Sequence, residues 1–170
     1  MKHYMYEFYS FEIDDGGRMR AGFKGTARDC ATRAIAIALE LPYRQIHREL
    51  TELQKSSRFE PTRKTWKSAC DGINISFREF HNYLNQYGLY PIYPPNGKHL
   101  QTVLGTLKQL AEEPLLIAFV TNHAVAIKNG VIYDNFPHHS RIARKLRVLY
   151  APKVSFWQIQ KSIWRNKFLR

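Results

Sequence analysis

The sequence predicts an α+β domain, because apolar residues recur at helical spacing in its first two thirds and then form strand-like runs around residues 115–134. The chain has 170 residues, of which 44% are hydrophobic and 14% aromatic, enough for one domain with a substantial core. We therefore expect residues 1–170 to form a single domain, with an N-terminal hairpin over residues 1–24 and a basic, aromatic tail over residues 151–170.

Helices are expected where an apolar stripe follows a residue type that favours helix starts. Asp29 precedes one such stripe, and Ser76 and Glu79 have the order of a capping box. The segments that fit are residues 30–41, 42–53, 76–87 and 99–110.

The tail from Ser155 has apolar residues at helical spacing, but its type of secondary structure stays open. Residues 55–75 are polar and irregular, and we interpret them as a loop at a cleft edge or a partner-contact segment, with Cys70 as a bystander.

A β-hairpin is the clearest local prediction. Asn129-Gly130 separates two apolar runs, and this dipeptide is the strongest short-range signal for a two-residue turn between strands. Such a turn pairs Ala126 with Tyr133 and makes His123 a diagonal neighbour of Asp134 on one face. A strand over residues 144–150 is expected to follow in the same sheet.

The face of the hairpin that bears His123 must pack on an apolar surface, because it also carries Val125, Ile127 and Ile132. We expect the helix after Cys30 to supply that surface, which would bring the sulfur toward His123. Asn135 is expected to point to the opposite side.

Cys30, His123 and Asp134 are the candidate catalytic residues. At a helix start, the thiol of Cys30 faces unpaired backbone N–H groups and the positive end of the helix dipole, which favour the thiolate. The charge of Asp29 opposes this effect. An adjacent imidazole turns such a thiol into a thiolate–imidazolium pair, and a carboxylate behind the ring holds its orientation. Each residue alone also suits a structural role, so the prediction depends on their joint order and spacing.

Three segments, GFKGTARDC (residues 22–30), LPY (41–43) and NHAVAIKNGVIYD (122–134), resemble the papain-like cysteine peptidase superfamily. Within it, the chain is most similar to bacteriocin-processing-type peptidases and small uncharacterised phage or prophage proteins. The resemblance implies a papain-like fold, in which a helical lobe led by the nucleophilic Cys packs on an antiparallel β-sheet. It also implies Cys30 as nucleophile, His123 as general base and Asp134 as the orienting group.

The oxyanion hole departs from the pattern of that superfamily, which places a Gln or similar donor a few residues before the Cys. No Gln or Asn occurs before Cys30 in this chain. Thr26, Arg28 or a second backbone N–H would have to act with the N–H of Cys30, since donor position counts more than donor identity. This departure leaves room for a slow, specialised or non-hydrolytic relative.

The charge of the chain is strongly positive, at +12, and no acidic residue follows Asp134. Trp157 and Trp164 lie among the basic residues of this region. A surface of this kind can bind single-stranded nucleic acid, steer an acidic protein or peptide substrate, or simply be solvated. The residues of this candidate basic patch are Arg141, Arg144, Lys145, Arg147, Lys161, Arg165 and Lys167.

No membrane association, metal or cofactor is expected. The sequence has no apolar run of membrane-spanning length, no secretory signal and no phosphate-binding glycine loop. Its two cysteines lie far apart and form no disulfide framework, which favours the reducing cytoplasm, or the host cytosol if the protein is phage-encoded. The adjacent His138 and His139 point in different directions, which does not suit a metal site.

These observations lead to one predicted function and two alternatives. The prediction is a cysteine hydrolase that cleaves a peptide or isopeptide bond through Cys30, His123 and Asp134, and that acts on a host protein if phage-encoded. One alternative is an acyltransferase or transglutaminase-like enzyme with the same triad. The other is a non-catalytic basic protein that binds nucleic acid or an acidic host protein on the same fold.

Overall fold

A computed structural model of the chain describes residues 9–56, 68–95, 97–107, 115–136 and 143–165. None of the helices in this part of the chain is both long and apolar enough to span a membrane. In chain order, its elements are β1 (Ser10–Ile13), α1 (Cys30–Leu39), α2 (Tyr43–Ser56), the short 3-10 helix η1 (Ala69–Asp71), α3 (Arg78–Gln86), β2 (Leu89–Ile92), α4 (Leu100–Leu107), β3 (Leu116–Val120), β4 (His123–Lys128), β5 (Val131–Asp134), β6 (Leu146–Pro152) and α5 (Lys153–Arg165).

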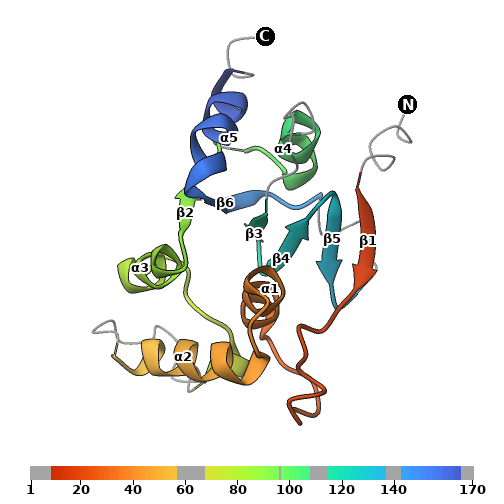
Figure 1. The fold of residues 1–170 in the computed structure, drawn as a ribbon, viewed down its shortest axis with the longest axis vertical. Coiled ribbons are helices and arrows are strands. Elements are labelled where there is room, and N and C mark those ends of the chain that lie inside the picture. The colour runs from red at the N-terminus through yellow and green to blue at the C-terminus, as the bar shows by residue number, and fades with distance from the viewer. Residues whose placement is uncertain (1–8, 57–67, 96, 108–114, 137–142, 166–170) are drawn as a thin grey trace.

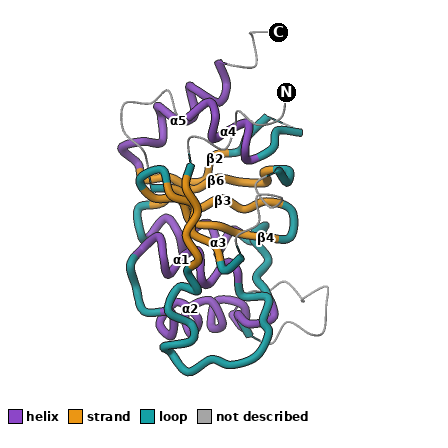
Figure 2. The backbone as a smooth tube through the Cα atoms, turned by 90° about the vertical axis from the view of Figure 1, so that its right-hand side faces the viewer, coloured by secondary structure: helices purple, strands orange, loops and turns teal. Residues whose placement is uncertain are grey.

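The described strands form one mixed sheet between two helical layers (Figure 1). The strand order is β1-β5-β4-β3-β6-β2, and all neighbours are antiparallel except β1, which is parallel to β5. In Figure 2, α4 and α5 lie on one side of the stacked strands, and α1, α2 and α3 lie on the other. The α+β class is therefore confirmed, but the sheet is mixed, whereas a purely antiparallel one was predicted, and helices cover both of its faces.

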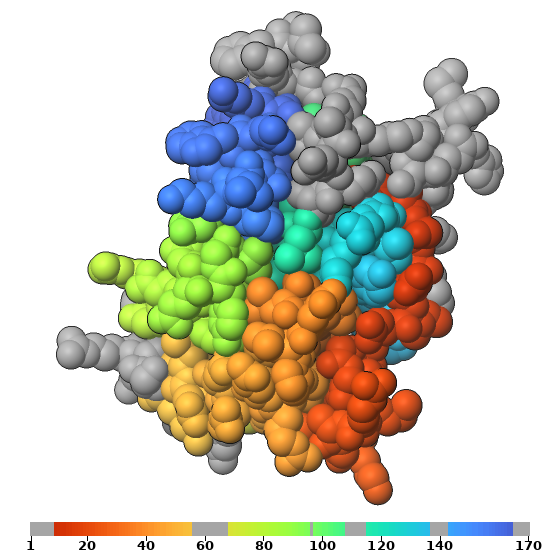
Figure 3. All heavy atoms as spheres, in the orientation of Figure 1, coloured from red at the N-terminus to blue at the C-terminus, as the bar shows by residue number. Residues whose placement is uncertain are grey.

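The predicted N-terminal hairpin over residues 1–24 is wrong for its described part. The strand β1 pairs with β5, and the residues after it form turns that run toward α1. The N–H of Gly16 donates to the side chain of Asp14 at 2.7 Å, and a Cβ at Gly16 would lie only 2.9 Å from the Cα of Arg33. The chain thus passes directly against the α1 backbone, as Figure 3 shows for the red and orange segments, and this route buries Arg18 beside α1.

Each face of the sheet has its own apolar core. The helix α1 packs on the face of β4 that carries Ala124 and Ala126, where small side chains allow a close approach. The helices α4 and α5 cover the opposite face, which carries Val125, Ile127 and Ile132. The prediction that α1 covers the Val125 face is therefore wrong.

The local predictions around the hairpin and the tail hold. Across the turn at Asn129-Gly130, where both residues have positive φ, Ala126 pairs with Tyr133 as predicted. The helix α1 begins at Cys30. The open question of the tail is answered by α5, which directs Ile159 and Ile163 inward.

Two helix caps differ from the prediction. The helix α3 follows Phe77 and has no side-chain cap, because the N–H of Ser76 donates to Asn74 at 2.9 Å and the chain turns before the helix begins. Asp29 precedes α1, but its side chain makes no capping hydrogen bond. The carboxylate of Asp29 instead contacts the side chains of Arg18, Arg33 and Tyr43.

Candidate active site

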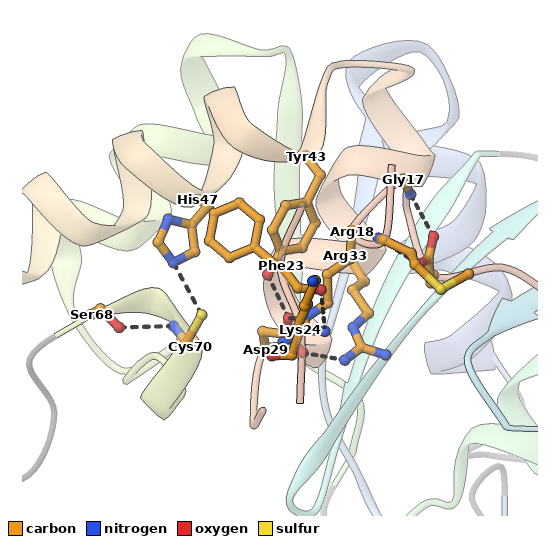
Figure 4. A network of polar contacts seen from close by, with 12 residues as sticks. Gly17, Arg18, Phe23, Lys24, Asp29, Arg33, Tyr43, His47, Ser68 and Cys70 are labelled. Atoms are coloured by element: carbon orange, nitrogen blue, oxygen red, sulfur yellow. Dashed lines mark hydrogen bonds and ion pairs between the residues drawn. The ribbon is translucent and has the colours of Figure 1, made fainter. Parts of the chain in front are cut away.

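The start of α1 is held by a buried carboxylate directly before Cys30. Asp29 is only 1% exposed, and its oxygens contact Arg18 at 2.8 Å and Arg33 at 2.6 Å. The hydroxyl of Tyr43 donates to the same carboxylate (Figure 4). Burial alone would raise the pKa of Asp29, but the contacts with Tyr43, Arg33 and Arg18 outweigh it, so the pKa lies below its ordinary value. Asp29 thus connects the N-terminal turns, α1 and α2 through Arg18, Arg33 and Tyr43, directly before Cys30 in the chain.

His123 and Asp134 lie at the ends of neighbouring strands and are in contact. The Nε2 atom of His123 lies 2.7 Å from Oδ2 of Asp134, and both side chains are buried. The hairpin register explains this contact, as the sequence predicted. Because Nε2 contacts the carboxylate, a proton transfer between this ring and a thiol would have to use Nδ1.

Asn135 connects this pair to α1, which covers the face of the sheet opposite to Val125. This contact fits the prediction that Asn135 points to the side opposite to His123. With its amide oriented so that donors face acceptors, its nitrogen donates to Oδ1 of Asp134 at 2.8 Å and its oxygen accepts from Arg33. Arg33 in turn pairs with Asp29. A continuous polar chain therefore joins the residue before the thiol to the carboxylate behind the imidazole.

Cys30 and His123 line one cleft of about 740 Å³. Backbone N–H groups of Ala124 and Ala31 interact with the sulfur, and Ala124 directly follows His123 in β4. Cys30 packs on the face of the sheet that α1 covers, at the start of β4. His123 is the first residue of β4, and the alternation of side chains along the strand assigns it to the opposite face, with Val125. The structure thus brings the thiol and the imidazole to the same cleft, and a direct contact between them stays a prediction.

The pKa of the Cys30 thiol lies above its ordinary value, whereas its helix position predicted a lowered one. Burial raises its pKa, and this effect exceeds the lowering by the N–H groups of Ala124 and Ala31. The negative charges of Asp29 and Asp134 raise the pKa further. Burial thus outweighs the effect of the backbone N–H groups on the pKa of Cys30.

The predicted oxyanion donors divide into two groups. Arg28 and Cys30 line the cleft, but Thr26 is exposed and lies outside its lining. The backbone N–H of Arg28 is already used, because it donates to the carbonyl of Cys70 at 2.8 Å. The amides of Asn74 and Asn122 also line the cleft, and the sequence analysis missed both. The position of Asn122 directly before His123 was the available signal.

The sequence analysis also missed a partner of Cys70. The sulfur of Cys70 in η1 lies 3.2 Å from Nε2 of His47 in α2 (Figure 4). The His47 ring packs on Phe23, with ring centres 4.7 Å apart. Burial lowers the pKa of His47, which disfavours the charged ring. Cys70 is therefore one half of a second thiol–imidazole pair, and no pattern within residues 55–75 signals it.

The candidate basic patch is only partly described. Arg141 and Lys167 lie outside the described residues, as does the side chain of Arg165. Of the other members, Arg147 lines the cleft. The remainder are exposed elsewhere, and they are Arg144, Lys145 and Lys161.

Within the part of the chain that the structure describes, no group of three or more His, Cys, Asp or Glu side chains is placed to hold a metal ion. His138 and His139 lie outside this part. Comparisons with protein-family models, curated proteins and solved structures found no match to this chain.

Proposed function

We propose that the protein is a papain-like cysteine hydrolase that cleaves a peptide or isopeptide bond. The observation that carries this proposal is that Cys30, at the start of α1, and His123, which contacts Asp134, line the same cleft. A nucleophile, a base and an orienting carboxylate in that order are what acyl transfer requires. Both cysteines are free thiols, which supports a reducing, cytosolic setting.

Because burial raises the pKa of the Cys30 thiol, the proposed role of His123 is that of a general base during the attack. As Sγ of Cys30 bonds to the carbonyl carbon, Nδ1 of His123 takes the thiol proton, and Asp134 stabilises the resulting imidazolium. The imidazolium then protonates the leaving amine, and an acyl thioester remains on Cys30. Water, deprotonated by His123, attacks the thioester, which releases the acid and restores the thiol. An amine in place of water would give acyl transfer with the same residues.

The test is covalent trapping. A peptide carrying an electrophilic acyloxymethyl ketone should alkylate Cys30, as located by mass spectrometry of the digested protein. The Cys30→Ala variant should not be labelled, and the matched Cys70→Ala variant should be labelled at the wild-type rate. Labelling of Cys70 alone would contradict the proposal, as would a peptide probe that reacts with Cys30 no faster than with free cysteine.

A second candidate function is binding by α5, and it rests on a different observation. Trp157 is 63% exposed and Val154 is 86% exposed on this helix, next to the exposed Lys161. Exposed indoles beside cationic side chains suit single-stranded nucleic acid, through stacking and phosphate contacts. Binding to a fluorescent oligothymidine that weakens steeply with salt, and that Trp157→Ala reduces, would support this function; the absence of binding at low salt would exclude it.

A further inference from the structure

An irregularity in the sheet directs an arginine into the cleft. Between β3 and β6, Phe119 pairs with Val148 and Val120 pairs with Leu146, so Arg147 is an extra residue in its strand. Such β-bulges occur next to functional sites, where they redirect a side chain. The side chain of Arg147 is exposed and lines the cleft that also holds Cys30.

Arg28 lines the same cleft from the loop before α1. Its backbone N–H donates to the carbonyl of Cys70 at 2.8 Å, which fixes the position of the loop. Its side chain is exposed. Two guanidinium groups, one from the sheet and one from the loop before the nucleophile, thus contribute to the lining.

The acidic side chains of the lining are already engaged within the protein. Asp29 is paired with Arg18 and Arg33, and Asp71 accepts a hydrogen bond from the N–H of Ser68 at 3.1 Å. The charge of Arg33 is offset by this pairing. The lining holds three arginines, Arg28, Arg33 and Arg147, against two carboxylates, Asp29 and Asp71, so it keeps a positive character that a ligand can neutralise.

From these observations, and on the basis of the proposed function, we infer that the cleft selects acidic peptides, with a substrate carboxylate next to the scissile bond bound by Arg147 and Arg28. A guanidinium holds a carboxylate with two parallel hydrogen bonds, which gives both charge and orientation. The exposed ring of Phe136 and the side chains of Ile73 and Ile75 supply an apolar wall for the rest of the peptide.

The experiment uses three peptide acyloxymethyl ketones that differ only at the residue before the reactive group, which is Asp, Asn or Lys. The measured quantity is the second-order rate of Cys30 modification, followed by intact mass. We expect the Asp probe to react about 10- to 100-fold faster than the Asn probe, since a hydrogen bond to a charged group contributes on this order, and the Lys probe to react slowest. Arg147→Gln and Arg28→Gln should each lower the Asp-to-Asn ratio several-fold.

Lys145→Gln is the matched control, because it removes one exposed positive charge close to Arg147 without changing the lining of the cleft. Iodoacetamide is the second control, since it carries no carboxylate and should alkylate Cys30 equally in all variants.

Equal rates for the Asp and Asn probes, or an equal loss of preference in Lys145→Gln, would overturn the inference on acidic peptides and leave the proposed hydrolase function intact. If iodoacetamide modifies Cys30 but no peptide probe does so faster than free cysteine, the hydrolase fails too. Arg147→Glu should shift the preference toward the Lys probe, and no shift would count against direct contact.

Discussion

The two cysteines of this chain differ in the support around the nearest imidazole. Cys70 contacts His47 directly, at 3.2 Å, but that ring is packed against Phe23 and burial lowers its pKa. Cys30 shares a cleft with His123, whose Nε2 is held by the Asp134 carboxylate at 2.7 Å.

This difference shows that proximity of a thiol to a ring is not the decisive feature of a catalytic site. Catalysis also needs a group that stabilises the imidazolium and a space for substrate. We propose that Asp134 and the cleft supply both for Cys30, which lines the cleft together with His123. Neither Cys70 nor His47 belongs to the lining of this cleft. The predictions below test whether the Cys30 region alone is catalytic.

The largest expected effect is that of removing the thiol of Cys30, and removal of the Cys70 thiol is the matched control. Cys30→Ala should reduce hydrolysis of an acidic fluorogenic peptide amide by about 10⁶-fold or to the uncatalysed rate, as for other nucleophiles of this kind. Cys70→Ala should stay within about twofold of the wild type, since it removes no group of the proposed triad. The reverse result would transfer the catalytic role to the Cys70–His47 pair.

The next effect is that of the imidazole and its carboxylate. Asp134→Asn should keep the fold but lower kcat by about 10²- to 10⁴-fold, because the imidazolium formed during attack loses its stabilising charge. His123→Ala should be at least as damaging, while His47→Ala serves as the matched control and should leave kcat unchanged. Steady-state kinetics at saturating substrate, with circular dichroism to verify folding, distinguishes these outcomes. A kcat that falls equally in His123→Ala and His47→Ala would remove the distinction between the two regions.

The third effect concerns stability. Asp29→Asn should lower the free energy of unfolding by about 3–5 kcal/mol, because it leaves the buried guanidinium of Arg18 without its charge partner. Urea titration measures this change. Glu40→Gln, at the other end of α1, removes an exposed carboxylate that pairs with Lys128 and should change stability little.

The pH dependence of stability tests the same carboxylate. The folded pKa of Asp29 lies below the ordinary value of 3.8, so its contribution is complete above pH 3.8 and is lost as the pH falls through the lower, folded value. The wild type should therefore lose stability in this acidic range, and Asp29→Asn should lose less. Parallel curves for the two proteins would show that the Asp29 pairs do not contribute as the structure indicates.

The features that local sequence determines were predictable, and the long-range ones were not. Asn129-Gly130 specifies a turn by itself, and that turn sets the contact between His123 and Asp134. The pairing of β1 with β5 joins residues about 120 positions apart, and no local pattern encodes it. The contact between His47 and Cys70 likewise depends on how α2 meets η1.

The docking face of α1 was mispredicted for a specific physical reason. Hydrophobicity ranks the Val125 face of β4 above the Ala124 face, and we expected the most apolar face to meet the nearest apolar helix. In the structure, the alanines of α1 instead meet Ala124 and Ala126, where small side chains allow close packing, and α4 and α5 cover the bulkier face. Shape complementarity decided the pairing, and a single sequence does not display it.

The smallest expected effect is in the alkylation of Cys30 with pH, and it tests the form of the resting thiol. Since burial raises the pKa of Cys30, the thiol should react with iodoacetamide more slowly at pH 7 than free cysteine, and its rate should still rise at a pH where free cysteine has levelled off. The Cys70→Ala variant isolates this signal, and His123→Ala should barely alter it, because in the proposed mechanism His123 acts only during attack on a carbonyl. Fast alkylation at pH 6 that disappears in His123→Ala would instead demonstrate a preformed thiolate–imidazolium pair. That outcome would require His123 to lie within direct reach of the sulfur before substrate binds, and it would make ion pairing, not general-base assistance, the source of the reactivity of Cys30.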